Sequence, residues 1–409
     1  MQKSNIIYLL SALLIILGCT EPFDTTTIDF ENVIVIEATI TNEQKFQKVL
    51  VSRTTMLEGI SGFSGESNAN VRVEDTQGNS YVFQETEQGV YISEVEFSAQ
   101  QSTDYQLRVT TALGNIYSSE IVQLTSETQI ENLSVSRNLN NQGEDGVFIY
   151  VDSFDPTGTS KYYRYEYEET YKIIAPNWSI TDGIIIQEDP LPNPPGFAVA
   201  LVPKTEEKKT CYNTVNNNEI ILTNTTQLME DRVSMFPVRF INKNNFIISH
   251  RYSILVKQFI QSKKSYDFYR TLKELSDIEN VFSQQQVGHL SGNIFSESNS
   301  NEKVLGYFDV TTISTQRIYF NYTDLFPGEN LPPYAIECEE ITPFKSVPSP
   351  PFGPPFSPLI IALKDGWLYY TINPTPIIDG LEAPWILVPP QCGDCTQLGS
   401  NQVPSFWID

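Results

Sequence analysis

Cys19 is the residue whose neighbours point most directly to a chemical reaction. It follows Lys3 and a strongly apolar run, Ile6 to Leu17, and the small Gly18 stands directly before it. This order is typical of a secretory signal peptide that is cleaved before a cysteine, whose thiol then takes a lipid. The apolar run is shorter than the roughly 20 residues that span a bilayer, so a plain transmembrane anchor is the weaker interpretation. We therefore expect residues 1–18 to be a signal peptide and Cys19 to carry an acyl lipid such as palmitate.

Four further cysteines remain once Cys19 is lipidated: Cys211, Cys338, Cys392 and Cys395. An even number in an exported chain favours two disulfides, and three pairings are open. A zinc site made of four thiolates is the second interpretation. A redox pair at Cys392 and Cys395 is the third, because such a pair normally opens a helix after a strand, whereas this one follows two prolines.

The sequence carries few residues that suit enzymatic chemistry. Its two histidines, His250 and His289, stand in no metal-binding spacing, and no G-x-S-x-G nucleophile motif is present. Acidic residues are so abundant that neighbouring carboxylates arise by chance, and the sequence gives no distance between them. We therefore expect no catalytic residue, no metal site and no cofactor.

Aromatic side chains offer a different chemistry, namely stacking on the rings of a ligand. Tyr163, Tyr165 and Tyr167 alternate along the chain and would share one face of a strand. Such a row is either a stacking platform for sugars or a set of cross-strand pairs, and general frequencies favour the pairs. Trp178 precedes a proline-rich stretch and is the tryptophan whose position best suits a ligand site. These four residues are the candidate stacking positions, and we expect the ligand to be a glycan or a peptide.

The charge of the chain excludes some classes of partner. Its 409 residues include 50 Asp and Glu against 26 Lys and Arg, which gives a formal net charge of −24. Binding to phosphates needs clustered Lys and Arg, and the sequence has no such cluster, so nucleic acid is not an expected partner. An anionic membrane surface would also repel the chain, and attachment to a membrane would depend on the lipid.

Strand signals dominate the elements that must position these residues. After a polar tether over residues 19–29, short alternating segments with Gly-Asn turns at 78–79 and 114–115 predict an immunoglobulin-like β-sandwich over residues 30–125. Residues 126–409 are expected to form a larger β-rich domain with one prominent helix near 262–280, where Phe268, Leu272 and Leu275 recur at helical spacing. Residues 175–210 contain closely spaced prolines between 190 and 195 and are expected to form an extended loop with little regular structure. The predicted fold class is therefore mostly β.

Several stretches of the sequence resemble, in their order, a known family. They are Cys19–Asp24, Val35–Glu43, Val49–Arg53, Tyr266–Tyr269, Ser291–Ile294, Val304–Phe308, Cys392–Cys395 and Pro404–Trp407. Together they resemble the Bacteroidetes outer-membrane lipoprotein family of domain of unknown function 4249. That family often carries Gly-Gly after the cysteine pair, where this chain has Leu398-Gly399-Ser400.

The resemblance implies a cellular location but no enzymatic reaction. Members of the family look like outer-membrane lipoproteins that often accompany TonB-dependent receptors, and they offer no catalytic residue to carry over. We therefore expect a non-enzymatic binding or accessory component of a TonB-dependent nutrient uptake system, held in the outer membrane by the lipid on Cys19. Whether it faces the surface or the periplasm stays open. A surface structural or adhesive lipoprotein is the first alternative, and a secreted carbohydrate-active hydrolase is the second.

Overall fold

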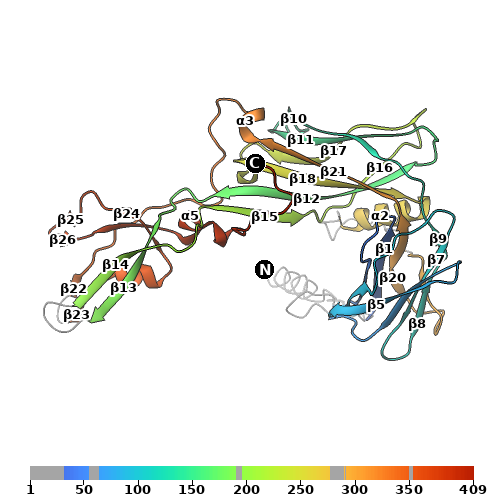
Figure 1. Ribbon diagram of the computed structural model, residues 1–409, viewed down its shortest axis with the longest axis horizontal. Helices are drawn as coiled ribbons and strands as arrows, with labels where there is room; N and C mark the ends of the chain where they lie inside the picture. The colour runs from blue at the N-terminus through green and yellow to red at the C-terminus, as the bar shows by residue number, and fades with distance from the viewer. Residues whose placement is uncertain (1–31, 55–63, 190–195, 277–289, 291, 350–352) are drawn as a thin grey trace, which may run out of the picture.

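A computed structural model describes residues 32–54, 64–189, 196–276, 290, 292–349 and 353–409. Cys19, the expected signal peptide and the expected tether lie outside the described residues. The described chain is mostly β, as the sequence predicts, and it forms an N-terminal sheet, a central body and a projecting arm (Figure 1). Within the described ranges, no helix has both the length and the apolar composition needed to cross a membrane.

The N-terminal sheet, here called sheet A, has the strand order β19-β8-β7-β4-β5-β6-β2-β1-β20, with β3 paired to β2 and β9 paired to β7. Alternation along its strands turns one face inward, so that Val71 and Val73, like Leu107 and Val109, are buried. The strands are β1 (Ile34–Thr41), β2 (Lys48–Arg53), β3 (Ser64–Gly65), β4 (Asn70–Asp75), β5 (Ser80–Glu87), β6 (Val90–Ser93), β7 (Asp104–Thr110), β8 (Ile116–Ser119), β9 (Val122–Gln123), β19 (Ile294–Ser296) and β20 (Val304–Thr311).

Two strands of sheet A come from late in the chain. Strand β20 pairs in parallel with β1, with Ile34 opposite Val304, and β19 pairs with β8 at the other end of the strand order. Gly306 makes the parallel pairing possible, because its φ is +105° and a Cβ there would overlap the carbonyl oxygen of Ile36. Sheet A is therefore complete only when residues 294–311 join residues 34–123.

The central body consists of two sheets that bury one apolar core between them. Val147, Ile149 and Val151 of one sheet share this core with Tyr165 and Val256 of the other. Sheet C contains β10 (Ile130–Leu139), β11 (Asp145–Asp155) and β17 (Asp231–Asn242). Sheet D contains β12 (Tyr162–Ile174), β15 (Thr210–Asn216), β16 (Ile221–Asn224), β18 (Arg251–Gln261) and β21 (Ile313–Asn321). Two short helical segments, η2 (Phe246–Ile248) and α3 (Tyr322–Leu325), lie beside these sheets.

The helix expected near 262–280 is present as α2 (Lys263–Ser276), and residues 277–280 lie outside the described residues. It begins directly after β18 and packs between the body and sheet A. Tyr266 meets Tyr162 of sheet D, with ring centroids 5.0 Å apart, and Phe268 meets Tyr307 of β20 at the same separation. Helix α2 therefore joins the two parts.

The loop expected over residues 175–210 is wrong, because this segment forms a β-hairpin. Strands β13 (Thr181–Asp189) and β14 (Gly196–Pro203) pair in antiparallel fashion. The closely spaced prolines fall between the two strands, outside the described residues, and leave the β-branched and apolar residues on either side free to pair.

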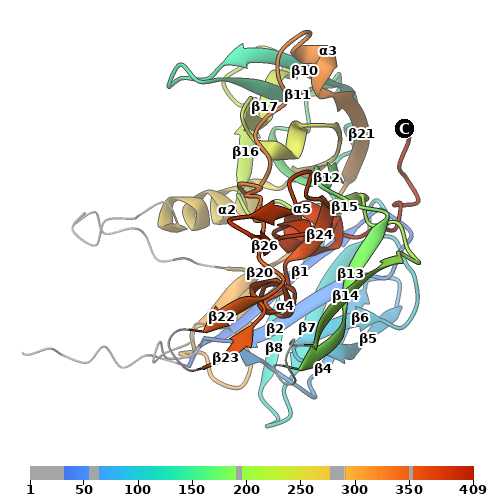
Figure 2. The ribbon, with the colours of Figure 1, turned by 90° about the vertical axis from the view of Figure 1, so that its left-hand side faces the viewer.

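This hairpin and the C-terminal segments make up the arm, which projects away from sheet A (Figure 1). Figure 2 shows α4 beside the hairpin. A small apolar core holds the arm together, including Leu359, Trp385 and Leu387. The C-terminal elements of the arm are β22 (Val347–Ser349), β23 (Gly353–Phe356), α4 (Pro358–Lys364), β24 (Leu368–Ile372), β25 (Ile377–Ile378), β26 (Leu381–Glu382), β27 (Trp385–Val388), α5 (Pro390–Gly393) and η3 (Cys395–Gln397).

The four cysteines form two disulfides, which confirms the favoured interpretation over zinc and over a redox pair. Cys211 of β15 is bonded to Cys395 of η3, and Cys338 is bonded to Cys392 of α5. Both bonds lie where the arm leaves the body. They fix the C-terminal segments of the arm to sheet D and to one another.

Candidate binding site

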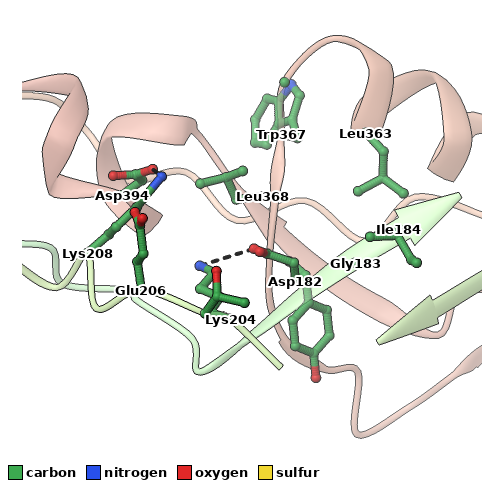
Figure 3. A pocket seen from close by; sticks show the side chains of 13 residues that line it. Asp182, Gly183, Ile184, Lys204, Glu206, Lys208, Leu363, Trp367, Leu368 and Asp394 are labelled. Carbon is green, nitrogen blue, oxygen red and sulfur yellow. Dashed lines mark ion pairs between the residues drawn. The ribbon is translucent and has the colours of Figure 1, made fainter. Parts of the chain in front are cut away.

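A cavity of about 430 Å³ lies on the arm between the hairpin β13–β14, the segment after it, helix α4 and strand β24 (Figure 3). We call it the arm cavity. Its lining consists of Asp182, Gly183, Ile184, Lys204, Thr205, Glu206, Lys208, Leu363, Gly366, Trp367, Leu368, Tyr369 and Asp394.

One wall of the arm cavity is apolar, and helix α4 positions it. The helix starts with a Ser357 N-cap, whose Oγ accepts a hydrogen bond from the N–H of Ile360 at 3.1 Å, followed by Pro358 in the first turn. It ends at Lys364, and Gly366 follows with a φ of +90° that lets the chain turn back. The turn places Trp367 next to the opening, on the side where Leu363 also lies (Figure 3).

The opposite wall is charged. Lys204 Nζ lies 3.3 Å from Asp182 Oδ1, and Lys208 Nζ lies 3.5 Å from Asp394 Oδ2 (Figure 3). The side chain of Lys204 is only 8% exposed, so its charge depends on Asp182 and on the ring of Trp178, whose centroid is 5.8 Å away. An apolar wall facing a few placed charges is the usual composition of a small-molecule site.

Asp394 is held in place by its own turn. Its Oδ1 accepts hydrogen bonds from the N–H of Thr396 at 2.8 Å and from the Thr396 hydroxyl at 2.6 Å. It stands between Cys392 and Cys395, which belong to different disulfides. The C-x-x-C segment therefore serves to fix a carboxylate at the edge of the cavity.

The sequence-predicted stacking residues separate into two groups. Tyr163 and Tyr165 are fully buried and Tyr167 is 5% exposed, so the stacking platform is wrong for them: closed packing between sheets C and D leaves no room for a ligand ring. Tyr165 instead donates a hydrogen bond to Gln258 Oε1 at 3.1 Å, and burial raises the pKa of Tyr167 to about 12. Trp178 is half-buried against the core, and its ring faces Lys204 at the margin of the arm cavity.

The lining residues of the arm cavity could not be found from sequence spacing. They come from four separate parts of the chain, residues 182–184, 204–208 and 363–369 and Asp394, and the first two were expected to lie in an irregular loop. The one local signal was the acidic residue inside the cysteine pair, Asp394. Nothing in the pattern connected it with Lys208.

Signs of metal or histidine chemistry are few in the described part of the chain. It contains no group of three or more His, Cys, Asp or Glu side chains placed to hold a metal ion. His250 lies next to the start of β18, where burial, with a smaller contribution from Lys172, lowers its pKa. His289 lies outside the described residues.

The fold and the arm cavity define a class: β-rich proteins in which a disulfide-fixed arm projects from a two-sheet body with an attached N-terminal sheet. The chain belongs to the family described as Domain of unknown function (DUF4249), whose profile matches residues 20–317. That match includes sheet C, the hairpin β13–β14 and the strands of sheet A, and it ends inside β21, before the C-terminal segments of the arm. No curated protein matches the chain.

Proposed function

We propose that this chain is a non-enzymatic binding lipoprotein of the outer membrane, anchored through Cys19, and that it acts as an accessory component beside a TonB-dependent transporter. The observation that carries the proposal is the arm. It is a projecting, covalently fixed unit, and it carries exposed apolar side chains that its own small core does not use.

Eight of the 24 large apolar side chains that are exposed in the described part of the chain lie on the arm. They are Ile180, Ile184, Ile186, Leu201, Phe356, Ile361, Ile372 and Ile377. Exposed apolar residues that gather in one region mark surfaces that contact another protein or a membrane. Two disulfides at the base of the arm keep these residues in place before any contact forms, which lowers the entropy cost of binding.

The arm cavity supports a cargo of glycan or peptide for such an accessory protein. The Trp367 ring offers an apolar face, and the Lys204–Asp182 pair offers a donor and an acceptor at the opposite wall. Sugars and peptides both combine apolar faces with polar groups and therefore suit a cavity of this composition.

The proposal is tested by recovering the full lipidated chain from detergent-solubilised outer membranes and identifying co-purified proteins by mass spectrometry. The test variant is Ile186→Glu with Ile377→Glu, which places charges on the arm at side chains about 60% exposed. The matched control is Leu113→Glu, an exposed apolar residue on the turn after β7. We expect a TonB-dependent receptor to be recovered with the native chain and the control, and roughly tenfold less of it with the arm variant.

Recovery of no receptor with the native chain would overturn the accessory function and favour a surface structural or adhesive lipoprotein. Equal recovery of the receptor with all three chains would keep the association but remove the arm as its contact.

A hydrolase is the second candidate function, and one observation favours it. Glu37 of β1 and Glu166 of β12 line one groove between sheet A and sheet D. Burial raises the pKa of Glu37, with Lys48 partly offsetting the effect, and a carboxyl group with a raised pKa can act as a general acid. Release of reducing sugar from a polysaccharide by the native chain, and not by Glu37→Gln, would establish this function in place of the non-enzymatic one.

A further inference from the structure

The groove between sheet A and the body has a volume of about 710 Å³, which is larger than the arm cavity. We call it the arginine groove. Strands β1 and β2 form one side, strands β12, β18 and β21 form the other, and Tyr269 of helix α2 also lines it. The residues that carry the argument are Glu37, Lys48, Arg164, Glu166, Lys257 and Phe259.

Alternation along β12 places Arg164 in this groove. Tyr163 and Tyr165 point into the core of the body, so Arg164 and Glu166 point to the opposite face of sheet D. Arg164 lies opposite Phe259 in the register with β18. The groove is therefore a consequence of the same alternation that buries the tyrosines.

Arg164 is buried with hydrogen-bonding capacity unused. It is 6% exposed, and its guanidinium carbon lies 4.3 Å from the ring centroid of Phe259 and 4.5 Å from that of Tyr269. Within the described residues its guanidinium donates only one hydrogen bond, from Nη1 to Glu166, and the buried Nε has no partner. Buried donors in native proteins almost always have an acceptor. The Nε of Arg164 is an exception and requires an explanation.

The buried carboxyl group of Asp309 accepts no hydrogen bond from that donor within the described residues. Asp309 attracts Arg164 electrostatically but forms no ion pair with it within the described residues. Its Oδ2 accepts hydrogen bonds from Ser265 Oγ and Gln261 Nε2 instead. Asp309 Oδ1 has no hydrogen-bond partner either, so it and the Nε of Arg164 are both buried without one. The guanidinium nitrogen that can meet a ligand in the groove is Nη2, which forms no hydrogen bond within the described residues and is not fully buried.

The lining of the arginine groove has an excess of one positive charge, in a chain that is otherwise strongly acidic. The groove is lined by four cations, Lys45, Lys48, Arg164 and Lys257, and by three carboxylates, Glu37, Glu43 and Glu166. Lys45 pairs with Glu43 at 2.6 Å. In the described part of the chain neither Lys48 nor Lys257 forms an ion pair, although Lys48 also attracts Glu37 of the same groove.

We infer that the arginine groove binds a ligand that carries a carboxylate, and that Arg164 is the residue that receives it. A carboxylate accepts strong, charge-assisted hydrogen bonds from a guanidinium, whose planar donor geometry lysine cannot offer. The rings of Phe259 and Tyr269 hold the guanidinium flat, and Lys48 and Lys257 add attraction from the groove walls. This site lies outside the arm and does not depend on the function proposed above.

The test compares each acidic probe with a neutral partner whose carboxylates are blocked, measured by calorimetry on the full mature chain in detergent. One pair is N-acetyl-alanyl-phenylalanine and its amide, which differ by one charge, and the other is trigalacturonate and its fully methylated ester, which differ by three. We expect at least one acid to bind roughly tenfold more tightly than its neutral partner at low salt, and less tightly as salt is added. The pair that shows the difference identifies the source of the carboxylate, a peptide end or an acidic sugar.

Three variants locate the binding. Arg164→Gln should weaken binding of the acid by roughly tenfold, and Lys257→Gln by about threefold. Lys209→Gln, which removes an exposed charge near the base of the arm, should leave it unchanged. Because Arg164→Gln empties a buried position and can unfold the chain, Arg164→Lys and Lys48→Gln provide the same test with less disturbance.

Equal affinity for acids and neutral partners, or no binding of any acid, would overturn the inference. Unchanged binding of an acid by a folded Arg164 variant would also overturn it, since Arg164 would then serve only to join sheet D to helix α2.

Discussion

Ser265 Oγ donates a hydrogen bond to Asp309 Oδ2 at 2.8 Å, and this bond joins helix α2 to strand β20 of sheet A. Gln261 Nε2 donates to the same oxygen at 2.9 Å. Asp309 is 1% exposed, and burial raises its pKa even though these bonds and Arg164 act in the opposite direction. The contact between the two parts therefore contains a carboxyl group that is easier to protonate in the folded chain than in the unfolded one.

The first prediction concerns the pH dependence of stability. Above the ordinary Asp pKa of 3.8 the unfolded chain loses this proton while the folded chain retains it, so the contribution of Asp309 to the free energy of unfolding falls as pH rises towards the raised value. Asp309→Asn removes that contribution. Urea unfolding from about pH 4 to about pH 8 should show the variant gaining stability relative to the native chain as pH rises. A constant difference would contradict this prediction.

The pKa of Asp155 is shifted in the opposite direction to that of Asp309. Burial alone would raise its pKa, but hydrogen bonds from Thr157, Thr159 and Ser160 outweigh that effect and hold the pKa well below its usual range. Its stabilising contribution is present above the ordinary value of 3.8 and is lost as pH falls below it.

Asp155→Asn should therefore lower the free energy of unfolding by about 2 kcal/mol near neutral pH, because one oxygen acceptor becomes a donor facing other donors. Asp365→Asn is the matched control, since Asp365 is exposed directly after α4, and it should change stability by less than about 0.5 kcal/mol. Equal effects in the two variants would show that the turn after β11 does not depend on the carboxylate.

Gly183 offers a test of packing in the arm. A Cβ at this position would stand 2.6 Å from the ring of Trp385, whereas a Cβ at Gly196 on the facing strand would meet only the end of the flexible Gln187 side chain. Gly183→Ala should destabilise the arm by about 1–3 kcal/mol and change the environment of Trp385, as measured by near-ultraviolet circular dichroism. Gly196→Ala should leave both measurements close to those of the native chain.

The disulfide between Cys338 and Cys392 should stabilise the arm chiefly by restricting its unfolded form. Its replacement by Cys338→Ala with Cys392→Ala is expected to cost about 2–5 kcal/mol. Limited proteolysis should then cut the C-terminal segments of the arm before it cuts sheet A. Simultaneous cleavage of both parts would indicate that the arm does not unfold as a separate unit.

Most strands could be predicted from the alternation of inward-facing and outward-facing residues within each segment. Val71 and Val73 face the core as their spacing requires, and the tyrosine row of β12 does share one face. The same alternation did not say whether that face meets solvent or another sheet, because burial depends on sheet C, which is built from distant residues. The hairpin β13–β14 was not predicted, because closely spaced prolines argue against strands, although here they lie only between the two strands.

The two cavities were beyond prediction for a related reason. Lys208 and Asp394 pair at the arm cavity because a disulfide between residues 211 and 395 and a backbone hydrogen bond from Cys395 to Lys208 hold their segments together. Arg164 faces β1 and β2 across the arginine groove because β20, which pairs with β1, leads directly into β21 of sheet D. No pattern within a single segment contains these long-range contacts.

The parallel pairing of β1 with β20 also sets an order of events during synthesis and export. Strand β1 leaves the ribosome early, but its partner strand, Val304–Thr311, is synthesised much later. One edge of β1 therefore remains unpaired until then. An open strand edge of this kind, with Ile34, Ile36 and Ile40 along it, readily pairs with another chain. We therefore expect the nascent protein to need a chaperone that covers this edge until the late strand arrives.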